Sequence, residues 1–381
     1  MSFSLPPESL DLDDDWSLSA YDYHLPPEQI AQNPAVPRDS SRLLVVAAAP
    51  TYDHRIFREL PELLQPGDLL VMNNTRVLSA RLHGRKVGGA QVEILLLEEQ
   101  ASNQWLALVK PGRRLKPGAR IRFFKPGAEA AFESDGLNET LEETLEATVL
   151  SVDADTSGRI LQFELSSDRP LLAVIQELGE VPLPPYINQS QADPEQYQTV
   201  YGDRPGSAAA PTAGLHFTPE LLERLTARGI EQVQITLHVG VGTFRPVEVE
   251  NITTHKMHGE WLEISPETIE KINTTKRNGG RVIAIGTTVT RALESAAQTG
   301  TLLPFSGKSD LFIYPGYQWR VVDGLITNFH LPKSSLMMLV SALIGRDRLL
   351  NLYAEAIAQN YRFYSFGDAM LILPESVMGK D

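Results

Sequence analysis

The chain has 381 residues, of which 42% are hydrophobic and 22% charged, a composition typical of a globular protein long enough for two domains. It contains no cysteine, which excludes disulfides, thiolate metal sites and a cysteine nucleophile. The net charge of −14 argues against nucleic-acid binding over the whole surface, but an average can conceal a local basic patch. The longest nearly apolar run, residues 336–344, is too short to span a bilayer, and the N-terminus lacks the order of a signal peptide. We therefore expect a soluble, cytoplasmic protein without a membrane partner.

An acidic tail, residues 1–18, opens the chain, and residues 19–72 carry helix and strand signals of their own. Short apolar runs separated by turn residues follow. Between Asp68 and Leu165 they read GDLLVMNN, AQVEILLLEE, WLALVK, ARIRFF, ATVLSV and RILQFEL. No helical period is sustained there, so the pattern predicts a small β-barrel, which we assign to residues 73–169.

The predicted barrel also contains the local basic patch. Between Arg76 and Lys125 there are eleven Lys or Arg residues against three Glu residues. Residues 126–157 then hold nine acidic residues and no Lys or Arg. The stretch 127–146 mixes Ala, Glu, Gly and Ser, and we interpret it as an exposed acidic insertion.

Strands and helices alternate after residue 170. The signals predict helices at 219–228, 265–278, 288–298, 334–345 and 347–360, and strands at 232–239, 281–286, 311–314 and 325–329. Such alternation indicates a parallel or mixed sheet. The predicted fold class is α/β: a mixed-sheet α/β domain built from both chain ends, residues 19–72 and 170–381, with the small β-barrel domain inserted between them.

Several familiar motifs fail on spacing. Gly307-Lys308-Ser309 resembles the end of a P-loop, but Leu302 stands where that loop needs a glycine, and we interpret it as a surface turn. Residues 238–242 follow a strand, but Arg245 occupies the third glycine position of a dinucleotide fingerprint. The two histidines near residue 256 lack the HExxH spacing of a zinc site, and no G-x-S-x-G appears. We expect no metal site.

Four turns are unusually rich in polar residues and glycine. They are residues 211–217 before a predicted helix, 238–244 after a predicted strand, 286–288 at a strand–helix junction, and 326–330 after another strand. Because ligands of open α/β sheets bind at strand ends, we expect the four turns to face one crevice. From the residues alone, this is an α/β enzyme for a small polar ligand with a basic accessory domain.

Long motifs in a fixed order carry a resemblance to a known family. They include PGSAAAPTAGLHF, LHVGVGTFRPV, MHGEW, VIAIGTTVTRALES, FIYPGY, LITNFHLPKSSLMMLVSA and YRFYSFGDAML, with YDYHLPPEQIAQNPAVPRDSSRLL and GDLLVMNNTRVLSARLHGRK nearer the N-terminus. Over residues 19–125 and 147–373 the chain resembles the S-adenosylmethionine:tRNA ribosyltransferase-isomerase family of the queuosine pathway. The acidic tail and the 127–146 region are additions to the family pattern.

The resemblance implies an α/β domain with a β-barrel domain, and a reaction. The ribosyl part of S-adenosylmethionine is transferred to 7-aminomethyl-7-deazaguanine at the wobble position of tRNA and isomerised, which gives epoxyqueuosine-tRNA, adenine and methionine. S-adenosylmethionine is consumed as a substrate, and no cofactor or metal is implied. The partners are then this tRNA and S-adenosylmethionine, and we expect the enzyme to act as a monomer.

Residue roles follow from matching this chemistry to the motifs. We predict His216, His238 and His330 as catalytic residues for proton transfer or orientation. Thr287, Thr288 and Arg291 are predicted to bind the methionine carboxylate, and Glu260 and Asp368 an amine or the ribose. Further substrate-binding candidates are Thr212, Gly240, Gly242, Thr243 and Asn328. The predicted RNA-binding residues are Arg76, Arg81, Arg85, Lys86, Lys110, Arg113, Arg114, Lys116, Arg120 and Arg122.

Two other functions compete with this one. A different nucleoside-handling transferase, such as an RNA methyltransferase, would use the same kinds of residue, and a pure RNA-binding module would need only the basic patch. Release of free adenine and methionine with tRNA present separates the first hypothesis from both, because methyl transfer yields S-adenosylhomocysteine and binding yields no product.

Overall fold

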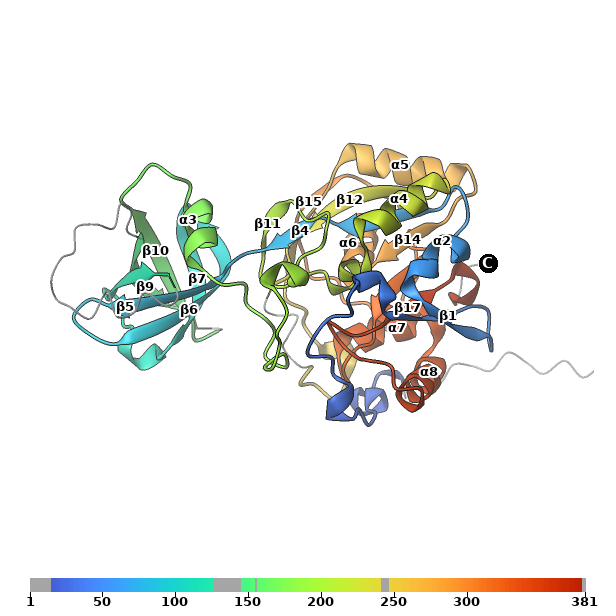
Figure 1. The fold of residues 1–381 in the computed structure, drawn as a ribbon, viewed down its shortest axis with the longest axis horizontal. Helices are drawn as coiled ribbons and strands as arrows, with labels where there is room; N and C mark the ends of the chain where they lie inside the picture. The colour runs from blue at the N-terminus through green and yellow to red at the C-terminus, as the bar shows by residue number, and fades with distance from the viewer. Residues whose placement is uncertain (1–14, 126–144, 155, 241–246, 379–381) are drawn as a thin grey trace, which may run out of the picture.

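The computed structural model of the protein describes residues 15–125, 145–154, 156–240 and 247–378. A β-barrel and a larger α/β domain lie side by side along its longest axis (Figure 1). The chain leaves the large domain through β4 (Thr75–Val77) and, after it returns, β11 (Arg204–Ser207) pairs with β4 in parallel. Both ends of the described chain lie in the large domain, as expected for an inserted barrel.

A nine-stranded mixed sheet forms the centre of the large domain, with the order β15-β13-β12-β3-β14-β16-β17-β1-β2. Strands β12, β3, β14 and β16 run parallel, whereas β17 is antiparallel to β16 and β13 to β12. Their bounds are β1 Arg42–Val46, β2 Tyr52–Ile56, β3 Leu69–Asn73, β12 Glu231–Leu237, β13 Glu260–Ile264, β14 Val282–Ile285, β15 Phe305–Ser309, β16 Gly324–Asn328 and β17 Ala369–Ile372. The predicted mixed α/β fold with an inserted barrel is confirmed.

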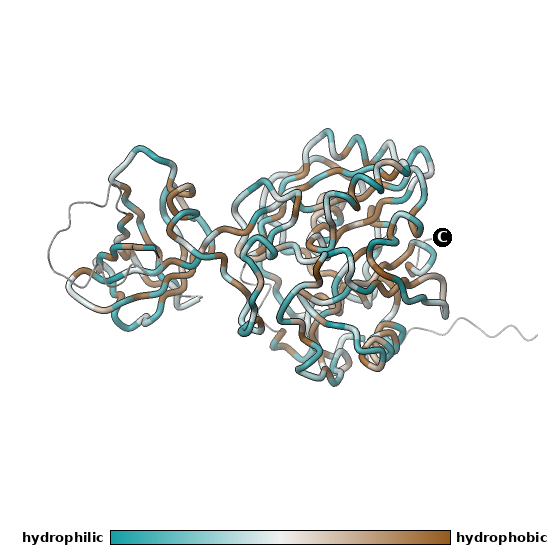
Figure 2. The backbone as a smooth tube through the Cα atoms, in the orientation of Figure 1, coloured by the Kyte–Doolittle hydropathy of each residue, from teal (hydrophilic) through white to brown (hydrophobic). Residues whose placement is uncertain are grey.

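Helices cover both faces of this sheet. They are α2 Leu60–Leu63, α4 Pro219–Ala227, α5 Pro266–Arg277, α6 Thr287–Ala296, α7 Ser335–Ile344 and α8 Arg346–Ala358. In β1, Leu43 and Val45 face the layer that contains α2 and α4, whereas Leu44 and Val46 face the layer of α5 to α8. This alternation follows from the two-residue period of a strand. Because both faces of the sheet are covered, hydrophobic residues are frequent in the interior of the large domain (Figure 2).

Three helices begin at N-cap side chains, where the sequence predicts. Thr218, Ser265 and Ser334 each accept a hydrogen bond from the backbone N–H three residues further on. Pro219 and Pro266 occupy first helical positions, where a missing N–H costs nothing. These caps fix the entry points of α4, α5 and α7.

The barrel closes through six antiparallel strands in the order β10-β7-β6-β5-β8-β9. Their bounds are β5 Arg81–Lys86, β6 Gln91–Ala101, β7 Gln104–Lys110, β8 Arg120–Phe124, β9 Leu145–Val152 and β10 Arg159–Leu165. Helix α3 (Leu171–Leu178) packs its apolar face on the barrel core. No described helix combines the length and the apolar character that a membrane crossing requires.

Four predictions about elements were wrong. The run GDLLVMNN was counted among the barrel strands, although most of it precedes residue 73, and it forms β3 in the large sheet. The sixth barrel strand is instead the polar segment Arg81–Lys86, which the sequence interpretation missed. Residues 311–314 form no strand, and their side chains pack on the core from a loop, while β15 at Phe305–Ser309 provides the sheet edge. That edge contains Gly307-Lys308-Ser309, which is therefore not a turn. Leu145 and Glu146 open β9 and do not belong to the acidic insertion; the rest of that insertion, apart from them, and residues 1–14 of the acidic tail lie outside the described residues.

Candidate active site

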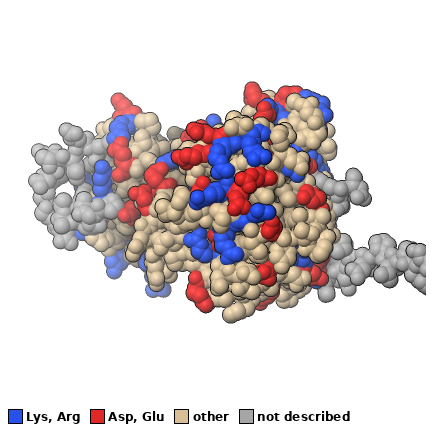
Figure 3. Space-filling model, turned by 45° about the vertical axis from the view of Figure 1, so that its right-hand side comes forward, with Lys and Arg blue, Asp and Glu red and all other residues tan. Residues whose placement is uncertain are grey.

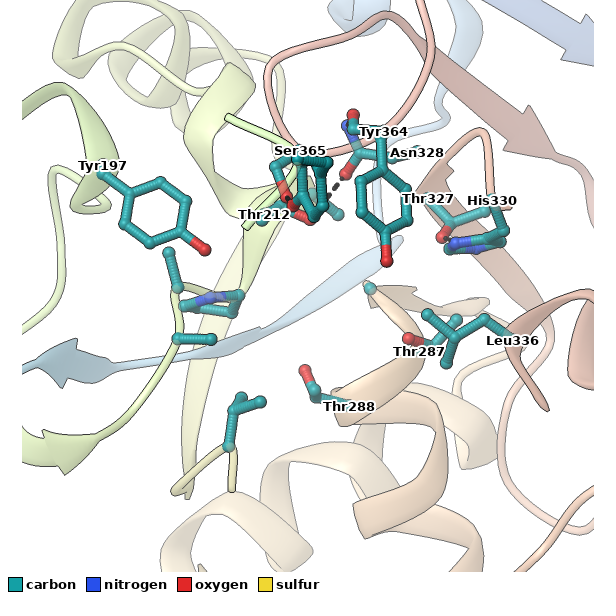
Figure 4. Close-up of a pocket in the computed structure, with 17 residues that line it drawn as sticks. Tyr197, Thr212, Thr287, Thr288, Thr327, Asn328, His330, Leu336, Tyr364 and Ser365 are labelled. Atoms are coloured by element: carbon teal, nitrogen blue, oxygen red, sulfur yellow. Dashed lines mark hydrogen bonds between the residues drawn. The ribbon is translucent and has the colours of Figure 1, made fainter. Parts of the chain in front are cut away.

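Four polar turns of the large domain meet around one small cavity of about 70 Å³, which we call the inner cavity (Figure 4). They contribute residues 211–213, Val239, residues 286–288, and Thr327, Asn328 and His330. Tyr186, Tyr197, Tyr364, Ser365 and Leu336 are further parts of its wall. None of the described lining residues is Asp, Glu, Lys or Arg, so the cavity presents hydroxyls, amides and one imidazole.

The first turn of α6 forms one wall of the inner cavity. Its N-cap is Gly286, whose φ of 91° strongly favours glycine, and no side chain caps the helix. Thr287 and Thr288 follow, and the buried Oγ1 of Thr288 has no hydrogen-bond partner among the described residues. Backbone N–H groups at a helix start together with two hydroxyls suit an anion such as a carboxylate.

His330 faces the inner cavity from the turn after β16 and is 5% exposed. Its Nε2 lies 2.9 Å from Oγ1 of Thr327, and its backbone N–H donates to the hydroxyl of Tyr353 over 3.0 Å. Burial lowers the pKa of His330 to about 3. The imidazole is therefore neutral at pH 7, and it is the one ordinary proton acceptor among the described lining side chains.

His216 lies behind the inner cavity and not on its described wall. Its ring is fully buried, stacks on Phe57 with centroids 4.9 Å apart, and has Nε2 3.1 Å from Nδ2 of Asn328. Burial, and then the charges of Arg38 and Arg362, hold the pKa of His216 well below its usual range. Of the two roles predicted for His216, proton transfer or orientation, the geometry does not support proton transfer, because His216 is absent from the described lining and its Nε2 faces Asn328.

A tight turn brings two further residues to the inner cavity. Tyr364 has a φ of 73°, unusual for a side chain of this size, and its ring lies against that of Tyr186. Gly367 closes the turn, since a Cβ there would lie 2.5 Å from the carbonyl oxygen of Arg362. The sequence interpretation did not select Tyr364 or Ser365, although both lie in the motif YRFYSFGDAML.

A second cavity, of about 580 Å³, lies between the two domains, and we call it the interdomain cleft. The barrel contributes Leu97, Glu98, Glu99, Trp105, Leu106 and Thr156, with Leu172 of α3 beside them, and the large domain contributes residues 205–206, 238–240, 258–261 and Lys308. An ion pair between Lys308 and Glu98 links the domains across it. Because Val239 lines both, the cleft adjoins the inner cavity.

His238 lies at this junction. Its ring stacks on Trp261 with centroids 5.2 Å apart, and its Nδ1 is 2.8 Å from Oγ1 of Thr75. Burial, and then the charge of Arg204, lower the pKa of His238 to about 4, so it too is a neutral imidazole at pH 7. A side chain at Gly206 would collide with this ring, because a Cβ there would lie 2.6 Å from it.

Glu260 lines the cleft and accepts hydrogen bonds from Gly240 and Arg291. Its Oε1 accepts from the backbone N–H of Gly240 over 3.0 Å, and Nη1 of Arg291 donates to its Oε2 over 2.6 Å. Arg291 is 7% exposed and also donates to the carbonyl of Leu311. Arg291 lines neither cavity among the described residues, so the predicted contact with a substrate carboxylate is not supported.

Asp368 is likewise occupied elsewhere. Its carboxylate accepts from the backbone N–H groups of Arg42 and Arg362 over 3.0 and 2.8 Å, and it is 1% exposed. This ties β1 to the turn before β17 and leaves Asp368 out of both cavities, contrary to the predicted substrate contact. The structure brings together Thr212, Thr287, Thr288, Asn328 and His330 in the inner cavity, and His238, Gly240 and Glu260 in the cleft. Gly242 and Thr243 lie outside the described residues.

The predicted RNA-binding residues divide into paired and open groups. Arg76 pairs with Glu195, Arg81 with Glu93, and Arg120 and Arg122 both with Glu146, while Arg85 and Lys86 are half-buried. Lys110, Arg113, Arg114 and Lys116 are exposed and form no ion pair among the described residues, and we call these four the basic strip. On the viewed face of the large domain, by contrast, charges of both signs are interspersed (Figure 3).

A polar cavity at strand ends, an adjoining cleft and a barrel with exposed cations define an α/β enzyme with an accessory β-barrel. A sequence model described as "Queuosine biosynthesis protein" matches residues 18–372, and the chain belongs to this family. It is 63% identical over 369 residues to an S-adenosylmethionine:tRNA ribosyltransferase-isomerase of a Nostoc species, covering 95% of this chain and 93% of the relative. A relative of the same name in Symbiobacterium thermophilum is 53% identical over 359 residues, covering 93% and 99%.

A crystal structure of S-adenosylmethionine tRNA ribosyltransferase from Thermotoga maritima is also similar to this chain. The TM-score is 0.52 at 38% sequence identity, and the match covers 93% of this chain and 100% of the other. The resemblance predicted from the sequence motifs is thus confirmed.

Proposed function

We propose that this protein transfers and isomerises the ribosyl group of S-adenosylmethionine onto 7-aminomethyl-7-deazaguanine in tRNA. The products are epoxyqueuosine-tRNA, adenine and methionine. The observation that carries the proposal is that four polar turns meet at an inner cavity that opens beside an interdomain cleft. Such a reaction needs both, because a small donor and a macromolecular acceptor must meet at one point.

S-adenosylmethionine spans the two cavities in this proposal. Drug-sized ligands occupy sites of about 300–1,000 Å³, so the inner cavity of about 70 Å³ holds only one part of the molecule. The carboxylate lies at the start of α6 beside Thr287 and Thr288. The ribosyl group then lies near Val239, where the cavities adjoin. The described lining of the inner cavity contains no Lys or Arg, which suits the positive sulfonium.

Two histidines take the proton steps. A base must remove a proton from the 5′ carbon, which the sulfonium acidifies, and His330 is the proton acceptor of the inner cavity. His238, at the junction with the cleft, accepts a proton from the aminomethyl nitrogen, which must lose its charge to act as a nucleophile. Both imidazoles are neutral at pH 7, so each starts the reaction with an unprotonated nitrogen that can accept a proton, and it can then return that proton to the departing adenine or to solvent.

The tRNA contacts both domains. The basic strip holds phosphates, and the wobble base leaves the anticodon loop and enters the cleft, where Trp261 and Trp105 offer aromatic surface. We propose that the protein acts as a cytoplasmic monomer and needs no cofactor or metal. The described residues contain no group of three or more side chains suited to a metal ion.

The deciding experiment incubates the protein with S-adenosylmethionine and tRNA that bears the 7-aminomethyl base. We expect adenine and methionine in equal amounts, with none formed when tRNA is omitted. Release of S-adenosylhomocysteine indicates a methyltransferase instead, and binding without any small product indicates an RNA-binding module.

A further inference from the structure

A chain of hydrogen bonds runs from the interior of the large domain to the wall of the inner cavity. Oγ of Ser41 lies 2.7 Å from Nδ1 of His216, and Nε2 of His216 lies 3.1 Å from Nδ2 of Asn328. The hydroxyl of Thr212 donates to Oδ1 of Asn328 over 3.0 Å, as Figure 4 shows. Of the four residues in this hydrogen-bond chain, Asn328 and Thr212 line the inner cavity. Ser41 and His216 can therefore affect a ligand only through these two.

The amide of Asn328 has one orientation that satisfies its neighbours. Nδ2 also lies 3.2 Å from the backbone carbonyl of Tyr364, which can only accept a hydrogen bond. The amide N–H groups must therefore face Tyr364 and His216, and the amide oxygen must face Thr212. A flipped amide would place its oxygen against the carbonyl of Tyr364 and leave a buried group without a partner.

This orientation also fixes the tautomer of His216. Because Nδ2 of Asn328 donates to Nε2, that nitrogen carries no proton, and the ring proton lies on Nδ1 and points to Ser41. Protonation of the ring would set two N–H groups against each other. The full burial of His216 and the nearby charges of Arg38 and Arg362 keep it in this neutral form.

The consequence appears at the cavity wall. Both N–H groups of Asn328 are used inside the protein, and the Thr212 proton is used by Asn328. The remaining lone pairs of Oδ1 and of the Thr212 hydroxyl are then available, so these two side chains accept hydrogen bonds from a ligand but donate none.

We propose that His216 is a positioning residue that holds Asn328 and Thr212 as an acceptor-only pair for an N–H donor of S-adenosylmethionine. This inference rests on the proposed function and names a contact of the same site. The donor is either the α-ammonium group or the 6-amino group of adenine, which share this chemistry. A pair that only accepts would reject a ligand that presents a carbonyl there.

The test replaces His216 with residues that keep different parts of the network. In His216→Gln the longer side chain can place a neutral acceptor toward Asn328, whereas the shorter side chain of His216→Asn keeps only the contact with Ser41. We expect His216→Asn to weaken S-adenosylmethionine binding about five- to tenfold, and His216→Gln to restore most of that loss. Binding is measured by calorimetry without tRNA, and thermal unfolding checks that each variant is folded.

Thr212→Val should weaken binding by a similar factor, and the combination with His216→Asn should be less than multiplicative, because both variants disturb one pair. His54→Asn, at an exposed histidine on β2, is the matched control and should change nothing. Titrations with free methionine and free adenine identify the donor, since only the ligand that contacts the pair loses affinity in His216→Asn.

Each outcome decides between roles. Equal loss of kcat in the Asn and Gln variants with unchanged binding would overturn positioning in favour of direct proton transfer. Wild-type binding in a folded His216→Asn variant would also overturn the inference. If the wild-type protein binds no S-adenosylmethionine and releases no adenine, the proposed function itself fails, which is a distinguishable result.

Discussion

No charged side chain belongs to the described lining of the inner cavity, whereas four exposed cations stand together on the barrel as the basic strip. In the cavity, neutral groups such as Asn328 and Thr212 are fixed by hydrogen bonds to one another. On the barrel, Arg113 and Arg114 extend from a short turn between β7 and β8. The two regions therefore bind through different forces.

Fixed polar groups in a buried cavity bind a ligand over the length of one hydrogen bond, and salt has little effect on this interaction. Exposed cations act on a phosphate backbone at longer range, and their contribution falls as salt displaces the released counterions. Ionic strength should therefore separate the two regions: binding in the inner cavity should be insensitive to it and binding of RNA strongly sensitive.

The largest effect is expected from His330→Ala. Removing the proton acceptor of the inner cavity should slow adenine release at least about 10²-fold, at low and high salt alike. Single-turnover assays with saturating tRNA measure the rate. The ring hydrogen-bonds Thr327, and the backbone groups of residue 330 that bond Tyr23 and Tyr353 are kept in the variant, so circular dichroism should show a native fold.

His24→Ala is the matched control, because His24 is exposed and lies outside both cavities. Its turnover should equal that of the wild-type protein. If His330→Ala keeps wild-type turnover, proton transfer in the inner cavity is wrong.

The next effect concerns the wall between the cavity and the cleft. Arg291→Met removes the guanidinium that neutralises the buried carboxylate of Glu260, and breaking such a pair lowers the free energy of unfolding by about 3–5 kcal/mol. The double variant Glu260→Gln with Arg291→Met should recover part of this loss. Urea unfolding measures both.

This variant also tests the role that the sequence suggested for Arg291. If Arg291 bound the methionine carboxylate, Arg291→Met would lose S-adenosylmethionine affinity while keeping its stability. The structure predicts the opposite: Arg291→Met should lose stability and keep most of its S-adenosylmethionine affinity.

The sequence was informative where local chemistry decides and uninformative where long-range packing decides. Glycine and threonine at Gly286-Thr287-Thr288 predicted a helix start suited to an anion, and that segment lines the inner cavity. The same local reasoning selected Arg291 because it lies one turn later, but its partner Glu260 is 31 residues away in the chain.

Burial was the other property that the sequence did not supply. His216 and His330 occupy similar turns, yet one ring packs behind Asn328 and the other faces the cavity. Trp105 and Trp261 come from different domains and meet at the cleft only in the folded chain. The barrel strand Arg81–Lys86 was missed because its charged residues obscure the alternation that marks a strand.

A smaller effect tests the barrel. Arg113→Glu with Arg114→Glu should weaken tRNA binding and reduce the log–log salt slope by about 0.7–0.9 for each lost phosphate contact. S-adenosylmethionine affinity should stay the same, because neither residue lines a described part of either cavity. Filter binding across a salt series measures the slope.

Arg277→Glu is the control for charge alone. Arg277 is exposed on α5, away from the barrel, and reversing it changes the net charge without touching the basic strip. If the double variant keeps its tRNA affinity at every salt concentration, the basic strip does not bind tRNA and serves only to protect a strand edge from pairing with another chain.

The smallest effect is expected from deleting residues 128–141. Strands β8 and β9 are antiparallel neighbours with Arg122 opposite Glu146, so residues 126, 127 and 142–144 suffice as a hairpin connection. The unfolding free energy should change by less than about 1 kcal/mol, since loop length has a weak entropic effect.

Shifting the deletion to 132–145 is the control, because it removes Leu145, which is fully buried in the barrel core, and should destabilise the protein. The first deletion also removes four acidic residues, so tRNA affinity should rise slightly at low salt while S-adenosylmethionine affinity stays constant. A large fall in melting temperature would show instead that the deleted segment packs against the barrel.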